Sequence, residues 1–219
     1  MRLEYMATIG VDEAGRGSVL GPMVIAGVKA SKYNIKKFAK EGIKDSKLVS
    51  PKKREIFARL IKELSDDYII KKVNPKTIDN YVINGKKFRR LNYLEAKTMA
   101  KIIDNLFAKT AYVDSCDINA KRYGITIKEQ LHNPIRIYSS HKADMKYTVV
   151  GAASILAKVA RDNEIKKLKK KYGDIGSGYP SDDKTIKFLK RYKKENKEFP
   201  NCVRSVSYTH LTLPTSDLV

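Results

Sequence analysis

The sequence alternates short apolar runs of strand type with longer helical repeats, and this alternation limits the possible folds more than any other feature. Residues 7–12 and 23–30 are rich in β-branched and apolar side chains, and the glycine-bearing run between them predicts two neighbouring strands joined by a short loop. Residues 67–73 predict a third strand. Before that strand, Ser50 is placed to cap a helix and Pro51 to begin it. The early part of the chain therefore predicts three strands, with a helix between the second and the third.

The rest of the chain continues this alternation. Apolar side chains recur at helical spacing over residues 91–108. A short buried strand is predicted at 110–115, and the alternation of residues 134–139 predicts another strand. A long helix is predicted over 148–173, followed by a last helix with acidic residues at its start. Strands that alternate with helices predict an α/β sheet covered by helices. A crossover helix before residues 110–115 would make that strand parallel to its early partner.

Positive charge dominates the composition. Among 219 residues there are 45 Lys and Arg against 24 Asp and Glu, which gives a net charge of +21. A surplus of this size concentrates polyanions, so nucleic acid is the leading partner, with a lysine bias of the whole genome as the alternative explanation. Hydrophobic residues make up 42% of the chain, which is enough to bury the core of one domain and excludes global disorder.

Several absences bear on where the protein works. No run approaches the ~18 apolar residues of a membrane-spanning helix, and the first residues lack the layout of a signal peptide. The two cysteines, Cys116 and Cys202, show no paired spacing, which fits a reducing compartment. We expect a cytoplasmic protein with no membrane partner, and a monomer.

The composition changes abruptly at residue 205. Residues 205–219 contain no Lys or Arg and a single acid, Asp217. Such a break is typical of a terminal tail, of residues that come from an expression vector, or of a misread terminus. The fold is therefore expected within residues 1–204, with 205–219 as an atypical tail.

Acidic residues follow two of the predicted strands at the point where each strand ends. Asp12 and Glu13 close the first strand, just before a glycine-rich loop, and Asp114 closes the strand at 110–115. Because sites in open α/β sheets gather beyond the carboxyl ends of parallel strands, Asp12 and Asp114 are expected side by side. Taken alone, the Asp12–Glu13 pair is also typical of a solvated strand end.

Carboxylates held this close repel one another unless a cation lies between them. Asp144, just before the long predicted helix, and Glu13 complete a candidate cluster of four acids. Clusters with only oxygen donors suit Mg²⁺ or Mn²⁺. Two such ions about 3.5 to 4 Å apart would activate a water and stabilise the departing oxygen of a phosphodiester. An acidic cluster in a strongly basic chain therefore predicts metal-assisted hydrolysis of a nucleic acid backbone.

Six short motifs stand in order along the chain. They are Asp12-Glu13-Ala14-Gly15-Arg16-Gly17, Asp45-Ser46-Lys47, Tyr112-Val113-Asp114, Lys142-Ala143-Asp144, Ala152-Ala153-Ser154-Ile155-Leu156-Ala157-Lys158-Val159 with Arg161-Asp162, and Gly176-Ser177-Gly178-Tyr179-Pro180-Ser181-Asp182. Together they resemble ribonuclease HII of the archaeal type, over roughly residues 5–204. Each motif is weak by itself, but six in register make the resemblance specific.

The resemblance implies the ribonuclease H fold, an α/β fold in which a five-stranded mixed sheet is flanked by helices, with a helical C-terminal region over roughly residues 165–204. It implies an endonuclease that cuts the RNA strand of RNA/DNA hybrids and ribonucleotides embedded in duplex DNA, leaving 3′-hydroxyl and 5′-phosphate ends. The implied cofactor is a divalent metal, Mg²⁺ or Mn²⁺, with two ions during catalysis. Whether the chain also binds a sliding clamp is left open.

The matching motifs also imply residue roles. The metal-binding catalytic acids of the family correspond to Asp12, Glu13, Asp114 and Asp144. The loop that senses the ribose 2′-hydroxyl corresponds to Gly15, Arg16 and Gly17. Glycines let a backbone approach a sugar edge closely, and the 2′-hydroxyl separates RNA from DNA. An ordinary tight turn between strands is the alternative for this loop.

Three further residues are candidate contacts with the substrate. Tyr179 resembles the aromatic residue that stacks on the sugar at the RNA to DNA junction, and a loop anchor packed on the core is the alternative. Lys47 and Lys142 are candidates for phosphate contacts, and solvated lysines are the alternative.

The sequence departs from the family pattern at a few positions. Ser18 stands where we expect proline, Gly151 stands where we expect serine, and no tryptophan follows Arg204. Two other functions stay open on the sequence alone. One is a non-catalytic basic protein that binds structured RNA, and the other is a different nuclease or strand-transfer enzyme with the same fold.

Overall fold

The centre of the structure is a five-stranded sheet with the strand order β3-β2-β1-β4-β5. The computed structural model describes residues 7–43, 49–84, 90–196 and 198–209. The strands are β1 (Thr8–Ala14), β2 (Met23–Ala30), β3 (Asp67–Val73), β4 (Thr110–Asp114) and β5 (Arg136–Ser140). β2 is antiparallel to β1 and β3, whereas β4 is parallel to β1 and β5. The predicted mixed sheet is confirmed, and its first strand continues past the two acids to Ala14.

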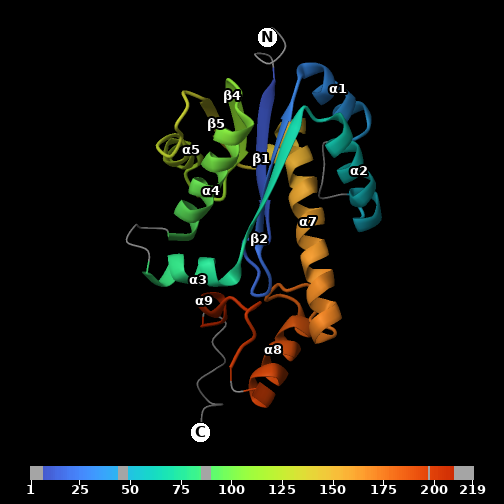
Figure 1. The fold of residues 1–219 in the computed structure, drawn as a ribbon, viewed down its shortest axis with the longest axis vertical. Coiled ribbons are helices and arrows are strands. Elements are labelled where there is room, and N and C mark those ends of the chain that lie inside the picture. Colours follow the sequence, from blue (N-terminus) through green and yellow to red (C-terminus); the bar gives the residue numbers. More distant parts are fainter. Residues whose placement is uncertain (1–6, 44–48, 85–89, 197, 210–219) are drawn as a thin grey trace.

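Helices cover both faces of the sheet. They are α1 (Lys32–Lys40), α2 (Pro51–Leu64), α3 (Pro75–Asn84), α4 (Arg90–Leu106), α5 (Ala120–Lys128), α6 (Ala143–Lys146), α7 (Thr148–Tyr172), α8 (Asp183–Asn196) and α9 (Ser205–Thr209). Figure 1 shows α3, α4 and α5 on one side of the sheet and α1, α2 and α7 on the other. Within the described ranges, no helix is long and apolar enough to cross a membrane.

The sequence does not predict five of the described helices, α1, α3, α5, α6 and α9. In α1 the Ser31 hydroxyl caps the helix by accepting a hydrogen bond from the Asn34 amide at 3.3 Å, but Phe38 is its one buried residue. A single buried side chain in a lysine-rich run leaves no helical period to detect. These short helices therefore depend on contacts that become visible only in the folded chain.

Two apolar layers enclose the sheet, and successive residues of β1 face different layers. Ile9 and Val11 pack with Met99 on the α4 side. Gly10 faces α7, where a Cβ atom would lie 2.3 Å from the Val149 carbonyl carbon, so glycine permits the close approach of the helix. Because side chains alternate along a strand, the two acids near the end of β1 also point to different sides.

The helix α7 connects the sheet to the C-terminal region. Its first half is buried against β1 and β2. Its second half extends past the sheet, where Ile165 joins a smaller apolar cluster with Phe188 of α8 and with Val203. Figure 1 shows α8 and α9 at the end of the molecule where β1 runs out. The C-terminal region therefore lies beside the edge of the sheet that carries the predicted acids.

The start of the predicted tail contacts the rest of the protein. The amide nitrogens of Ser205 and Val206 donate hydrogen bonds to the Asp79 carboxylate of α3, at 2.9 and 3.3 Å. Residues 205–209 form α9 beside α3. The described part of this segment is thus attached to the domain.

Candidate active site

The parallel pair of β1 and β4 brings two of the predicted acids together. The paired register runs to Val11 and Val113, so the next residues, Asp12 and Asp114, follow at the carboxyl edge of the sheet. The two carboxylates are close enough to interact electrostatically. Asp12 is buried and forms a side-chain hydrogen bond with Ser154 of α7. The Asp114 carboxylate accepts a hydrogen bond from the Ala143 amide at 2.5 Å. Neighbouring helices therefore orient both carboxylates.

Asp144 joins these two acids from α6, where it is 3% exposed. The pKa of Asp12 is raised to about 7, mainly because burial penalises its charged form. The negative charges of Asp114 and Asp144 add to the rise, and the hydrogen bond with Ser154 opposes it. The three carboxylates thus share one electrostatic environment, as the sequence predicts.

Glu13 faces the other side of β1, toward α4. There Glu95 is fully buried. Burial raises the pKa of Glu13 well above its usual value, and the charges of Glu95, Asp12 and Asp114 raise it further. Oxygen Oε2 of Glu13 is buried and has no hydrogen-bond partner among the described residues. The fourth predicted acid is therefore near the other three but approaches them from the opposite layer.

The donor set fits a hard divalent cation but is not preassembled around one. All four predicted ligands are carboxylates, the donors that Mg²⁺ and Mn²⁺ prefer. A cation would also supply the partner that Glu13 Oε2 lacks among the described residues. In the part of the chain that the structure describes, no three Asp, Glu, His or Cys side chains are close enough to hold a metal ion as they stand. Binding therefore requires side-chain rotations, which repulsion between the carboxylates opposes until a cation is present.

The loop that follows β1 is tightly held on one side and open on the other. Gly15 has a φ of +77°, and a Cβ atom there would lie 2.4 Å from Nε of Arg161. The hydroxyl of Ser18 donates to the Gly15 carbonyl at 2.9 Å, so the residue that replaces the expected proline closes the turn by a hydrogen bond. Gly17 is exposed, and nothing lies within 4 Å of a Cβ atom built on it. The protein itself therefore requires glycine at position 15 but not at position 17.

The Arg16 side chain points toward α4. Its Nε lies 3.1 Å from Oε2 of Glu95, and its Nη2 donates to Oδ1 of Asn92 at 2.6 Å. The sequence does not predict a role for Glu95 or Asn92, because both stand inside the helical repeat at 91–108 and outside the six motifs. A charged residue on the apolar side of that repeat is the signal that marks Glu95 as unusual.

Two buried arginines join this loop to the loop that carries Tyr179. The Arg204 guanidinium is fully buried and donates to the carbonyl oxygens of Gly21 at 3.0 Å and Arg16 at 2.9 Å. Burial is the main reason that the pKa of Arg204 is lowered to about 10. The guanidinium of Arg161 lies 4.3 Å from the centre of the Tyr179 ring, in a cation–π contact. The two predicted substrate-contact loops are therefore linked by one framework.

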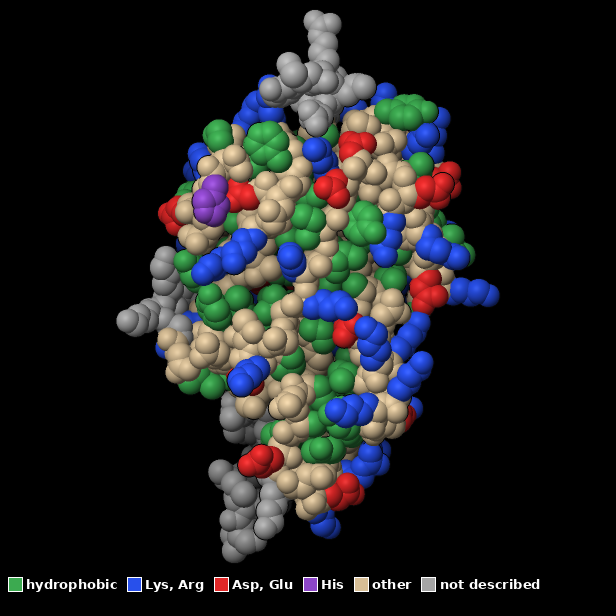
Figure 2. All heavy atoms as spheres, viewed as in Figure 1, with side chains coloured by type: hydrophobic (Ala, Val, Ile, Leu, Met, Phe, Trp, Pro, Cys, Tyr) green, Lys and Arg blue, Asp and Glu red, His purple; other side chains and the backbone are tan. Residues whose placement is uncertain are grey.

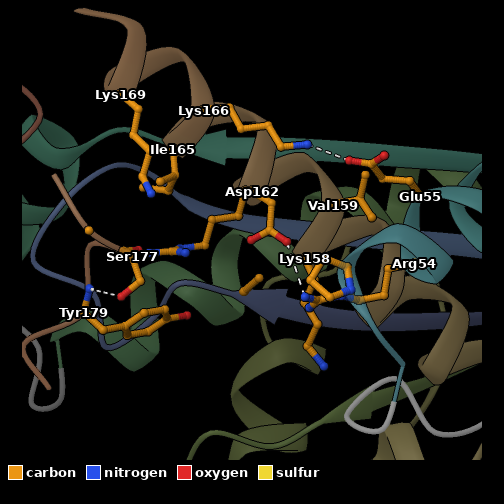
Figure 3. Close-up of a pocket in the computed structure, with 14 residues that line it drawn as sticks. Arg54, Glu55, Lys158, Val159, Asp162, Ile165, Lys166, Lys169, Ser177 and Tyr179 are labelled. Atoms are coloured by element: carbon orange, nitrogen blue, oxygen red, sulfur yellow. Dashed lines mark hydrogen bonds and ion pairs between the residues drawn. The ribbon is translucent and has the colours of Figure 1, made fainter. Parts of the chain in front are cut away.

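A groove of about 480 Å³ opens between α2, α7 and the segment that carries Tyr179 (Figure 3). Its basic lining residues are Arg54, Lys158, Arg161, Lys166 and Lys169. Asp162 lies among them and forms an ion pair with Arg54 at 3.6 Å. Figure 2 shows further Lys and Arg side chains over α7 and α8 on the face in view. The groove thus has a predominantly cationic wall and lies next to the loop that follows β1.

The other residues predicted to contact the substrate lie at different places in the chain and in the structure. Tyr179 is half-buried and lines the groove. Lys142 is exposed and has a left-handed backbone, with φ of +55°, directly before α6 and Asp144. Lys47 lies outside the described residues. The structure therefore brings Lys142 near the acids and Tyr179 to the groove.

A mixed five-stranded sheet with carboxylates at the ends of its central parallel strands, Asp12 buried and Asp114 half-buried, defines a metal-dependent nuclease of the ribonuclease H class. A comparison with protein families is more specific, because the profile described as Ribonuclease HII matches residues 9–210. The chain belongs to the ribonuclease HII family and is an endonuclease that acts on the RNA of RNA/DNA hybrids.

Individual relatives agree with this assignment. Ribonuclease HII of Thermococcus sibiricus is 49% identical over 197 residues, which cover 89% of this chain and 85% of the relative. The crystal structure of ribonuclease H2 from Pyrococcus horikoshii OT3 is 43% identical with a TM-score of 0.83, covering 92% of this chain and 93% of that one. RNase HII in the PCNA:RNase HII complex from Archaeoglobus fulgidus is 40% identical with a TM-score of 0.82, covering 90% and 93%. These similarities confirm the predicted family and fold.

Proposed function

We propose that the chain cuts the RNA strand of hybrids and also cuts at single ribonucleotides embedded in duplex DNA, leaving 3′-hydroxyl and 5′-phosphate ends. The proposed ligands of two divalent ions are Asp12, Glu13, Asp114 and Asp144. The observation that carries this proposal is the meeting of carboxylates from β1, β4 and α6 at one edge of the sheet, next to a loop with exposed backbone. Those from β1 and α6 are buried, and the one from β4 is half-buried.

In this proposal, the groups beside the carboxylates hold them in position to bind the metal ions. Divalent ions, when bound, supply an activated water and stabilise the departing oxygen of the phosphodiester. The bonds from Ser154 and from the Ala143 amide hold Asp12 and Asp114 in place for this task. Ligands must be deprotonated to bind a metal, and the pKa of Asp12 is about 7. Metal binding should therefore release protons and strengthen as the pH rises toward neutral.

In this proposal, the loop after β1 recognises the ribose of the substrate. The open space at Gly17 leaves room for a sugar edge to approach the backbone. Arg16 is held by α4, and Tyr179 by the stacked guanidinium of Arg161, so neither has to be ordered when the substrate binds. A preorganised loop can distinguish the presence of a 2′-hydroxyl from its absence by hydrogen bonding to the group.

The groove beside Tyr179 supplies the proposed contact with the duplex backbone. Its lysines and arginines are the residue types that neutralise phosphates without reading base sequence. Lys142, exposed next to Asp144, and Lys47 are proposed phosphate contacts nearer the scissile bond. A ribonuclease acting on many sequences needs contacts of this sequence-independent kind.

The test is cleavage of a labelled duplex that carries one ribonucleotide, in Mg²⁺, Mn²⁺ or EDTA, with all-DNA and all-RNA duplexes as controls. We expect metal-dependent cutting at the ribonucleotide, with product ends carrying 3′-hydroxyl and 5′-phosphate groups. The variant Asp114→Asn should still bind the duplex but should not cut it, because it loses a charged ligand. Cleavage of the all-DNA control would overturn the proposed recognition of the 2′-hydroxyl. Full activity of Asp114→Asn would overturn the proposed metal site.

A further inference from the structure

Glu95 is a fully buried carboxylate that the proposed mechanism does not use. It lies in the middle of α4, among side chains that form the apolar layer on that face of the sheet. A charge at such a position is costly unless specific partners compensate it. Its partners therefore indicate what the charge does.

Those partners come from two different segments. Oε2 of Glu95 lies 3.1 Å from Nε of Arg16 and accepts a hydrogen bond from the Cys116 thiol at 3.1 Å. One turn earlier on the same face of α4, Oδ1 of Asn92 accepts the second bond from Arg16, at 2.6 Å. The guanidinium is thus held at two of its nitrogens by one helix, in a fork that fixes its plane.

The orientation of the Asn92 amide is itself determined. Its Nδ2 donates to Oδ2 of Asp117 at 3.0 Å, so its oxygen faces Arg16. Asp117 is 4% exposed and forms an ion pair with Arg122 of α5. The anchor for Arg16 therefore extends from α4 to the segment after β4 and to α5.

The backbone of the same arginine is held from the other direction. The carbonyl oxygen of Arg16 accepts a bond from the buried Arg204 at 2.9 Å. Gly15, before it, packs against Arg161, and Ser18, after it, closes the turn. Arg16 therefore presents its loop with both the main chain and the side chain fixed.

We infer that Glu95, assisted by Asn92, is a positioning residue that locks the Arg16 loop in the conformation that recognises the ribose 2′-hydroxyl. This inference rests on the proposed function of that loop. The charge of Glu95 also gives the guanidinium a partner other than Glu13, on the same side of the sheet. Without it, the arginine is free to turn toward solvent or toward the metal ligands, and the loop loses its side-chain anchor.

The experiment measures selectivity in binding rather than cleavage. Dissociation constants of the full chain are measured in EDTA for a labelled duplex with one ribonucleotide and for the all-DNA duplex of the same sequence. Selectivity is the dissociation constant for the all-DNA duplex divided by that for the ribonucleotide duplex. This ratio does not depend on the overall charge of the protein, because overall charge changes the affinity for both duplexes alike. The variant Glu95→Gln keeps the shape of the side chain but replaces a charge-assisted bond by a neutral one, and we expect the ratio to fall by about tenfold. Affinity for the all-DNA duplex should stay unchanged.

A double-mutant cycle separates positioning from general structural damage. If Glu95 acts through Arg16, the ratio for Arg16→Met should be the same whether or not Glu95→Gln is also present. Additive losses in the double variant would overturn the inference. The matched control is Glu164→Gln, which removes the charge of an α7 glutamate paired with Lys72 of β3 and Lys167 of α7. It should leave the ratio unchanged. A loss of equal size in this control would also overturn the inference.

Thermal unfolding of each variant shows whether it folds. If Glu95→Gln does not fold, Asn92→Ala removes the second anchor, and a selectivity equal to that of the unaltered protein would contradict the inference. If the unaltered protein binds both duplexes equally, both the proposed function of the loop and the inference about Glu95 are contradicted. If it discriminates and Glu95→Gln discriminates equally well, only the inference about Glu95 falls.

Discussion

Replacing Asp12 by Asn should stabilise the metal-free protein at neutral and alkaline pH while abolishing metal-dependent cleavage. Asp12 is 5% exposed and lies within the electrostatic influence of Asp114 and Asp144. Folding without a metal therefore places a charge where both burial and neighbouring charges oppose it. Asparagine has almost the same shape, keeps the capacity to hydrogen-bond to Ser154 and carries no charge at any pH.

The size of the effect follows from the pKa of Asp12, which is raised from 3.8 to about 7 in the folded protein. The folded state therefore binds a proton more tightly than the unfolded state. The stability that this proton provides is complete below about pH 4 and is lost as the pH rises to about 7. A rise of the pKa from 3.8 to about 7 corresponds to a loss on the order of 4 kcal/mol of unfolding free energy, and the loss is constant at higher pH.

The assay is urea unfolding of the protein and of Asp12→Asn in EDTA at several pH values from 4 to 8. At pH 4 the two should be equally stable, and at pH 8 the variant should be more stable by a few kcal/mol. Added Mg²⁺ should stabilise the protein in proportion to its binding, and should stabilise the variant much less. The matched control, Asp67→Asn at the exposed start of β3, should change stability little at either pH.

A variant that is no more stable than the protein at pH 8 in EDTA would refute this reasoning. It would mean that the Asp12 carboxylate is solvated or paired in the metal-free protein, so that its charge has no cost. An equal gain at pH 4 and pH 8 would be a second contradiction, because it would show an effect of shape rather than of ionisation.

Four further predictions test the surroundings of the site. Gly15→Ala should lower the Tm and the unfolding free energy by about 2 kcal/mol or more, because the positive φ and the contact with Arg161 exclude a side chain. Gly17→Ala should leave the Tm unchanged but reduce cleavage of the ribonucleotide duplex, because only the substrate would meet the added methyl group. Arg204→Met should destabilise the protein by about 3 kcal/mol in urea unfolding, because two buried carbonyl groups lose their donor. Lys158→Ala in the groove should weaken duplex binding equally with and without a ribonucleotide, and should reduce the slope of log affinity against log salt by about 1.

Local signals predict those parts of the fold whose side chains repeat within one element. Ser50 accepts a hydrogen bond from the Lys53 amide and α2 begins at Pro51, as the capping pattern indicates. The strand at 67–73 was recognisable from its own residues and occupies the expected range. The short helix α1 could not be recognised, because its single buried residue, Phe38, is identified as buried only by the sheet against which it packs.

The site residues likewise divide into those that local sequence patterns predict and those that only the fold identifies. Asp12 and Asp114 could be paired from the sequence, because the end of each strand and the parallel crossover are both local patterns. Asp144 could be added because it precedes a long helix. Glu95 could not be assigned, since the helical period shows that it lies among buried residues but not which loop it meets. Its partner Arg16 is 79 positions away in the chain.

The sequence by itself determined the alternation of strands and helices, the acids at the strand ends, the basic character and the family to which the chain belongs. The tertiary structure alone decided that Glu13 and Asp12 face different layers of helices, that α4 anchors the arginine of the glycine-rich loop, and that Arg204 holds the same loop from the C-terminal region. The physical reason is that hydrophobic period and capping act over a few neighbouring residues. The compensation of a buried charge, in contrast, depends on whichever distant group the completed fold places beside it.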